Sequence, residues 1–276
     1  MKRRIWLCAD DYGISPGVNR AIRDLIENGR LNATSVMVVG PAIGRDEVNA
    51  LVASIKANPR CAIGLHTTLS APFRPLTMHF RPTEGGLFLP HARLLRRGLT
   101  GRLDFEVVHT ELMVQLKAFV DLFGRPPDFV DGHQHVQLFP GVRKAFLAAV
   151  KEAAPKAWIR QCGRDRPWTQ RLDSPKAFVL DALSAQFRKH AARAGLSFNP
   201  AFAGAYDFSK QPEFSPLMQQ FVHGMPEAGI VMCHPGVVDD VLISLDPLTV
   251  QRESEYEFLR SDRFLPMLAA NDVTLD

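Results

Sequence analysis

The sequence predicts an α/β fold and, within that class, a (β/α) barrel. Three observations support this prediction: the chain is 276 residues long, short apolar runs alternate with amphipathic segments, and several of the apolar runs end in acidic or histidine side chains. Barrels of this class routinely occupy about 200–250 residues as one domain. Strands that alternate with helices form a parallel sheet covered by helices. We therefore expect a single domain over residues 1–276.

The N-terminal elements carry the clearest signals. Ile5–Ala9 is an apolar run, which predicts a buried strand. A helix should follow, because Ser15 can cap it, Pro16 suits its first position and Gly29 suits its exit. Apolar residues recur at helical spacing between these signals and predict one buried face; they are Val18, Ala21, Ile22, Leu25 and Ile26.

The same alternation continues along the chain with one interruption. We predict further strands at Ser35–Val39, Ala62–His66, Asp128–Asp131, Ala157–Gln161, Gly229–Cys233 and Val273–Leu275. We predict further helices at Asp46–Ala57, Asp104–Phe123, Gly141–Ala153, Lys176–Ala194 and Pro247–Ser261. The interruption is the segment 67–101, which holds four prolines and little periodicity. Because it is too long for an ordinary connection, we expect an irregular insertion near the site.

Composition excludes several classes of protein. With 46% hydrophobic and 22% charged residues, the chain is neither disordered nor a coiled coil. No apolar run approaches the roughly 20 residues of a membrane-spanning helix, and the run after Arg4 is too short for a secretory signal. The four cysteines lack metal-ligand spacing, so a reduced, cytoplasmic setting is expected. The basic excess of four charges, partly in the segment Lys156–Lys176, is typical of a solvated face, and no nucleic-acid-binding motif accompanies it.

Four apolar runs end in side chains that can bind a metal or exchange a proton. The residues that follow or end these runs are Asp10-Asp11, His66, Asp131-Gly-His133-Gln-His135 and His234. In barrels the carboxyl ends of the strands meet on one face, and catalytic groups come from several of them. We therefore expect these side chains to form one site.

The combination of Asp and His predicts a catalytic metal site. One Asp and two His form a common ligand set that leaves positions open for water and substrate. On an extended strand His133 and His135 would point the same way, so periodicity alone pairs those two as ligands. Each ligating ring needs its second nitrogen held by a neighbour, and Asp131 is a candidate for that role.

The adjacent carboxylates Asp10 and Asp11 require a turning backbone. Neighbours on a regular strand face opposite sides, so both can serve one site only if the chain turns there, which Gly13 would permit. Adjacent carboxylates do not fit a glycosidase, which needs its pair about 5–9.5 Å apart across the scissile bond. One carboxylate on the metal and the other as a base is the consistent interpretation.

Four segments together resemble the YdjC-like carbohydrate deacetylases. They are Ala9-Asp-Asp-Tyr-Gly13, Ile63-Gly-Leu-His66, Asp131-Gly-His-Gln-His135 and Met232-Cys-His-Pro-Gly236. That family includes chitooligosaccharide deacetylases and a branch associated with hopanoid lipid biosynthesis. The resemblance implies a distorted (β/α) barrel related to the NodB-like polysaccharide deacetylases, and one YdjC-like domain over the whole chain.

The resemblance also implies roles for individual residues. It makes Asp11, His66 and His133 the ligands of one divalent metal, Mg²⁺ or Zn²⁺, with Asp10 as catalytic base and His234 as general acid. Arg160 matches a basic position that orients the base, whereas His135, Asp131 and Tyr12 are expected to touch substrate or support a ligand.

The implied reaction is metal-assisted hydrolysis of an N-acetyl group on an amino sugar, which releases acetate. The expected substrate is an N-acetylated oligosaccharide or a hopanoid glycolipid, and we allow for a homodimer. No nucleic-acid partner and no membrane span are expected.

Two alternatives stay open at this stage. One is a metal-dependent amidohydrolase or phosphoesterase of another barrel family, although such amidohydrolases place their H-x-H pair after the first strand. The other is a non-catalytic sugar-binding module that has kept the fold. An Asp10→Asn variant separates catalysis from binding, because a binding module tolerates the loss of the base and a deacetylase does not.

Overall fold

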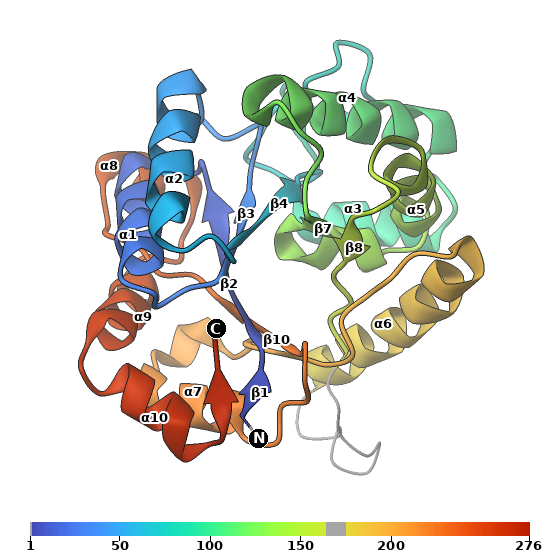
Figure 1. Ribbon diagram of the computed structural model, residues 1–276. Coiled ribbons are helices and arrows are strands. Elements are labelled where there is room, and N and C mark those ends of the chain that lie inside the picture. The colour runs from blue at the N-terminus through green and yellow to red at the C-terminus, as the bar shows by residue number, and fades with distance from the viewer. Residues whose placement is uncertain (1, 164–174) are drawn as a thin grey trace. The chain divides into compact units, whose positions relative to one another are not determined.

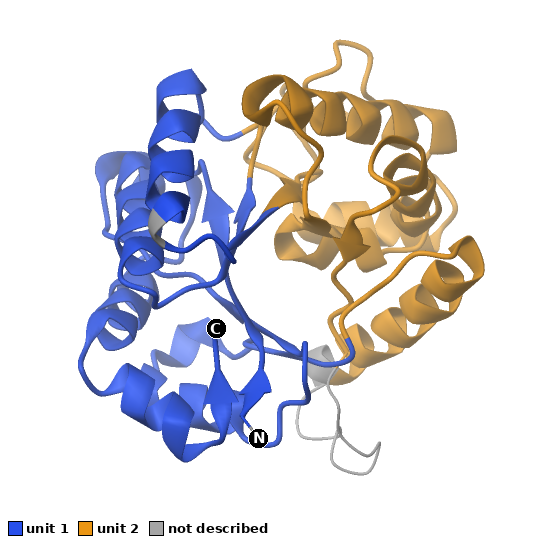
Figure 2. Cartoon of the chain, viewed as in Figure 1, with its two compact units in different colours: residues 1–36, 40–63, 200–276 blue, residues 37–39, 64–199 orange. Residues whose placement is uncertain are grey.

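The computed structural model describes residues 2–163 and 175–276. The chain divides into two compact units, which Figure 2 colours separately. Unit 1 comprises residues 1–36, 40–63 and 200–276, and unit 2 comprises residues 37–39 and 64–199. Part of the basic segment Lys156–Lys176 lies outside the described residues. The expectation of one domain stays a prediction.

Unit 1 is built on four parallel strands in the order β3-β2-β10-β9. Figure 1 labels the first three of them. The central strand β2 (Trp6–Tyr12) is buried from its second residue onward, which explains its continuous apolar start. Its neighbours are β3 (Ala33–Val36) and β10 (Ile230–Cys233), and β9 (Phe202–Ala203) lies beyond β10.

The remaining elements of unit 1 are mostly helices. They are α1 (Pro16–Glu27), α2 (Arg45–Ala57), α7 (Phe214–Val222), α8 (Asp240–Leu245), α9 (Val250–Arg260) and α10 (Phe264–Ala270), with a 3₁₀ turn at Phe208–Lys210. Near the two termini, β1 (Arg3–Arg4) pairs in parallel with β11 (Val273–Thr274).

Helix α1 forms as its sequence predicts. Ser15 is extended and its hydroxyl accepts a hydrogen bond from the Val18 backbone N–H at 3.2 Å, which satisfies one of the free donors at the helix start. Pro16 occupies the first turn, and Gly29 follows the helix with a φ of +64°. All five predicted apolar residues are buried, and the helix packs against α2.

Unit 2 contains three parallel strands in the order β4-β7-β8. They are β4 (Ala62–Thr67), which belongs to this unit from Gly64 onward, β7 (Phe129–Gly132) and β8 (Trp158–Ile159). The strands lie close because Gly64 has no side chain: a Cβ there would stand 2.4 Å from the Phe129 ring. The register places His66 opposite Asp131.

The helices of unit 2 include α4 (Phe105–Phe123), α5 (Val142–Ala153) and α6 (Pro175–Ala194), and α4 packs against α5. The segment 67–101, expected to be irregular, contains the antiparallel pair β5 (Thr83–Glu84) and β6 (Leu87–Phe88) and a regular helix, α3 (His91–Leu99). That helix is short and arginine-rich, with Leu94 and Gly98 as its buried residues, so its apolar periodicity was too brief to predict.

The predicted α/β class is confirmed, since parallel strands alternate with helices in both units. Within the described ranges, no helix combines the length and apolar character that a membrane crossing requires.

Candidate metal centre

Strand β2 departs from regular geometry near its end, where Asp10 and Asp11 occupy successive positions. Asp11 has a φ of +67°, a left-handed conformation that residues other than glycine seldom adopt, and the pairing of β2 with β3 shifts register between Ala9 and Tyr12. The backbone therefore departs from regular strand geometry at Asp11, still within β2, and Gly13 follows the strand with a φ of +102°. Both carboxylates are buried.

The two carboxylates have different partners. Asp10 Oδ1 accepts a hydrogen bond from the Ser35 hydroxyl at 3.2 Å and one from the Cys8 thiol at 3.6 Å. Asp11 Oδ2 instead lies 2.6 Å from Nη2 of Arg252, a fully buried arginine on α9. Asp10 thus accepts hydrogen bonds from two neutral donors, whereas Asp11 forms an ion pair with a full positive charge.

Tyr12, the next residue, directs its hydroxyl to α2. The hydroxyl donates to Glu47 Oε1 and accepts from Arg23 Nη1 at 3.2 Å. Burial raises the pKa of Tyr12, and Arg23 acts against that rise. The hydroxyl is therefore occupied by structural partners. A role in contacting substrate or supporting a ligand stays a prediction.

His234 follows β10 directly, as predicted. Its backbone N–H donates to Glu255 Oε2 at 2.5 Å, and its ring lies edge-on to Phe208 at 5.5 Å between centroids. Burial lowers the pKa of His234 below 6.5, while Asp11 and Asp10 act in the opposite direction. Ring atom Nδ1 is buried and has no hydrogen-bond partner among the described residues. Burial therefore favours the neutral form of this ring in the free protein.

The unit 2 residues of the site form a chain of buried ionic contacts. His66 Nδ1 lies 2.6 Å from Asp131 Oδ1, and Asp131 Oδ2 lies 2.7 Å from Arg160 Nη2. All three side chains are buried. The predicted partnership of Asp131 with a histidine is thus present, and it leaves His66 Nε2 as the nitrogen for a metal. Arg160 forms an ion pair with Asp131 here, and its expected role in orienting the base Asp10 stays a prediction.

The histidine pair of the H-x-H segment does not follow an extended strand. Strand β7 ends at Gly132, and residues 133–138 form a 3₁₀ segment in which Gln134 and His135 have φ values of +54° and +60°. The expectation that His133 and His135 point the same way on a strand is therefore wrong. His133 lies beside His66, with ring centroids 5.5 Å apart, whereas His135 Nδ1 lies 3.4 Å from the Cys162 thiol.

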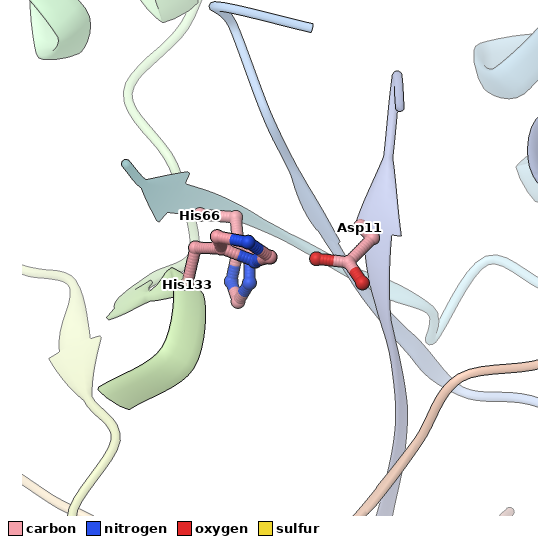
Figure 3. Close-up of side chains that lie close together, drawn as sticks. All are labelled: Asp11, His66 and His133. Carbon is pink, nitrogen blue, oxygen red and sulfur yellow. The ribbon is translucent and has the colours of Figure 1, made fainter. Parts of the chain in front are cut away.

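The residues that can ligate a metal are shown in Figure 3. One possible ligand atom from each of Asp11, His66 and His133 lies within 4.8 Å of the others, and all three residues are buried. The carboxylate comes from the end of β2, one imidazole from β4 and the other from the first residue after β7. These three are the ligands that the family resemblance implied, and they form a candidate metal group.

Sequence reasoning missed a pair of buried charges on α9. Arg252 contacts Asp11, and Glu255, one turn later, accepts the His234 backbone N–H and the Tyr206 hydroxyl. Burial raises the pKa of Glu255 to about 7, although its hydrogen bonds with Tyr206 and His234 act against the rise. The available signal was the buried face of α9, where charged residues stand at positions that apolar ones normally fill.

Comparisons with known proteins agree with the sequence motifs. The family model described as YdjC-like protein matches residues 4–270. A chitooligosaccharide deacetylase from Citrobacter koseri is 30% identical over 242 residues, which cover 88% of this chain and 85% of that protein. One from Escherichia fergusonii is 28% identical and covers 94% of this chain and 88% of its own length.

A solved structure extends the agreement to the fold. The structure of a proposed cellobiose-phosphate cleavage protein from Enterococcus faecalis V583 superposes with a TM-score of 0.75 at 18% identity, and the match covers 100% of this chain and 97% of that one. The two chains therefore share a fold. Since the family model spans nearly the whole sequence, the resemblance inferred from the four segments is confirmed: the chain belongs to the YdjC-like protein family.

Proposed function

We propose that this protein is a metal-dependent carbohydrate N-deacetylase. The observation that carries the proposal is the group Asp11, His66 and His133, in which Asp131 holds Nδ1 of His66 and leaves Nε2 for a metal. The chitooligosaccharide deacetylases that it matches support the same reaction class. The reaction is hydrolysis of an acetamide to acetate and a free amino sugar.

The residues fit one divalent cation. One carboxylate and two neutral imidazoles suit Zn²⁺ and leave coordination positions open, and the buried Asp131 carboxylate sets the tautomer that a ligating His66 requires. When bound, Zn²⁺ or Mg²⁺ would supply Lewis-acid polarisation of the acetyl carbonyl and acidification of a water molecule. We favour Zn²⁺ because two of the three ligands are nitrogen donors.

Two side chains of the protein, Asp10 and His234, each carry out one proton transfer. Asp10, held by the Ser35 hydroxyl and the Cys8 thiol, accepts the proton of the attacking water. His234 delivers a proton to the departing amine. Because burial lowers its pKa, His234 is neutral at rest and must take up a proton before it can donate one.

We propose an N-acetylglucosamine-bearing oligosaccharide as the substrate, because the matched relatives are named for chitooligosaccharides. A hopanoid glycolipid, a homodimer and a cytoplasmic location stay predictions. The experiment is acetate release from a panel that runs from N,N′-diacetylchitobiose to an N-acetylglucosaminyl glycolipid, with and without a chelator. Chelator-sensitive release supports the proposal and identifies the substrate class.

Two variants with matched controls make the test sharper. Asp10→Asn should lose at least a hundredfold in kcat while it keeps its metal, because a general base contributes about 10²–10⁴-fold. Asp121→Asn, an exposed carboxylate paired with Lys117, is the control. His66→Ala should lose the metal, and the exposed His190→Ala should not. Normal turnover by Asp10→Asn would refute the base assignment. Absence of release from the metal-loaded protein would favour another amidohydrolase, a phosphoesterase or a sugar-binding module.

A further inference from the structure

Helix α9 carries an arginine whose side chain is fully buried beside the candidate metal group. Arg252 Nη2 lies 2.6 Å from Asp11 Oδ2 and 2.7 Å from Asp246 Oδ2. Its Nε donates to the Leu248 carbonyl at 3.0 Å. The guanidinium is therefore fixed by three contacts through two nitrogens, and it fixes one oxygen of Asp11 in turn.

This contact matters because Asp11 does not hold its place through regular strand geometry. Its left-handed backbone is a strained conformation that persists only where the surroundings impose it. The ion pair with Arg252 is such a constraint, since it pins the carboxylate end of the residue. Without this pair, the backbone at Asp11 would be free to relax, and the carboxylate would shift with it.

Arg252 is not explained by the stability of the fold alone. A buried ion pair is weak evidence for stability, because well-packed apolar side chains of similar volume often serve as well or better. Arg252 Nη1, moreover, is buried with no hydrogen-bond partner among the described residues. An unsatisfied buried donor is unfavourable in a purely structural ion pair. At a site that receives a ligand, the ligand can accept the hydrogen bond that this donor lacks.

The same helix also holds the segment that carries His234. The backbone carbonyl of Arg252 accepts a hydrogen bond from Gly236 N–H at 3.0 Å, and Glu255 accepts the N–H of His234. A Cβ at Gly236 would lie 3.4 Å from both Cβ and Cδ of Arg252, so the segment passes close to this side chain. Arg252 thus connects Asp11 to the segment 234–236.

We propose that Arg252 is a positioning residue for the metal centre: through Asp11 it sets the affinity of this chain for a divalent cation, with Asp246 as its second anchor. The inference rests on the proposed function, because Asp11 must be a ligand for its position to matter to the metal. It extends that function to a residue outside the four sequence segments.

The test is titration of the full-length protein with Zn²⁺ in competition with a chelating dye. Arg252→Lys keeps the charge but loses the Nε contact and the planar fork, so its dissociation constant for Zn²⁺ should rise about 10–100-fold, the usual effect of losing a group that orients a ligand. Arg260→Lys is the control, since it lies on the same helix, is exposed and pairs with Glu257. Its dissociation constant should stay within twofold of that of the unaltered protein.

A wild-type dissociation constant in Arg252→Lys would overturn the inference. If this variant does not fold, Asp246→Asn carries the test, because it removes the second anchor and leaves Arg252 and Asp11 in place. A weaker affinity in Asp246→Asn supports positioning, and an unchanged affinity overturns it. His66→Ala distinguishes a failure of this inference from a failure of the proposed function: if it abolishes Zn²⁺ binding while Arg252→Lys binds normally, only the role of Arg252 fails. If the unaltered protein binds no Zn²⁺, the proposed function and this inference fail together.

Discussion

Replacing Asp131 by asparagine should damage the metal centre although the two side chains have the same shape. Asp131 sits between two donors, Nδ1–H of His66 at 2.6 Å and the guanidinium of Arg160 at 2.7 Å, with all three side chains buried. A carboxylate accepts from both partners. An amide has one accepting oxygen and one donating nitrogen, so it can accept from only one.

Each orientation of the new amide has its own cost. If the oxygen faces Arg160, the NH₂ group faces His66 and forces Nδ1 to become the acceptor. The proton then moves to Nε2, the nitrogen that the metal requires. If the oxygen faces His66, the NH₂ group meets the guanidinium and the buried ion pair with Arg160 is broken, which costs about 3–5 kcal/mol.

We therefore expect Asp131→Asn to raise the dissociation constant for Zn²⁺ about 10–100-fold. Its unfolding temperature should fall by about 10 °C, because a loss of 1 kcal/mol in unfolding free energy lowers that temperature by about 2–4 °C in a protein of this size. Dye-competition titration and thermal unfolding measure the two effects. The control is Asp128→Asn, whose partly exposed pair with Arg125 should contribute no more than about 1 kcal/mol.

A double variant tests the reasoning behind these numbers. In Asp131→Asn with Arg160→Met, the amide oxygen is free to face His66, so the correct tautomer returns and Zn²⁺ affinity should recover at least in part. If affinity does not recover, the tautomer argument is wrong. If Asp131→Asn alone binds Zn²⁺ as the unaltered protein does, His66 does not depend on Asp131.

Three further predictions concern pH, metal removal and a helix cap. Burial raises the pKa of Glu255 from 4.5 to about 7. Between these two pH values the folded chain keeps a proton that the unfolded chain has lost. The unfolding free energy should therefore decrease by about 3 kcal/mol as the pH rises from 4.5 to 7. Urea unfolding across this range should give a smaller decrease for Glu255→Gln, and an identical slope would contradict the assignment. Chelation of Zn²⁺ held at a hundred times its dissociation constant should remove about 2.7 kcal/mol of stability, and the same treatment should leave His66→Ala unchanged in thermal unfolding. Ser15→Ala should lower the urea-derived unfolding free energy by about 1 kcal/mol, whereas Ser209→Ala, in an exposed turn, should change it little.

The positions of most candidate site residues could be predicted because these acidic and histidine side chains end or follow the apolar runs of the strands. In parallel sheets the carboxyl ends of neighbouring strands meet at one edge, so the order of apolar runs alone located Asp10, His66, Asp131 and His234. The pairing of His66 with Asp131 also follows from this rule, since the two residues share a register position on β4 and β7. Strand periodicity is a local property, and a sequence expresses it directly.

The failure at His133 and His135 has a physical cause. The period of two applies only while the backbone stays extended, and here the chain curls immediately after Gly132. The curl is held by a distant contact, in which Gln137 Nε2 donates to the backbone carbonyl of Arg160. Space for it depends on Gly132, where a Cβ would stand 2.6 Å from Gln137 Oε1. No local pattern predicts a partner that follows a different strand, as Arg160 follows β8.

Arg252 was beyond sequence reasoning for a related reason, and the way it was missed suggests what to look for. It contacts Asp11 from a position 241 residues away, so no spacing connects the two. Its helix was predicted, but the buried face of α9 includes Gln251, Arg252 and Glu255 beside Phe258. Charges on a face that must be buried need partners, because an unpaired buried charge is strongly unfavourable. When such charges occur in a chain whose strand ends carry an acid-rich site, that site offers the partners. In this chain, the charged residues on the buried face of α9 are therefore as informative about the metal centre as the four sequence segments are.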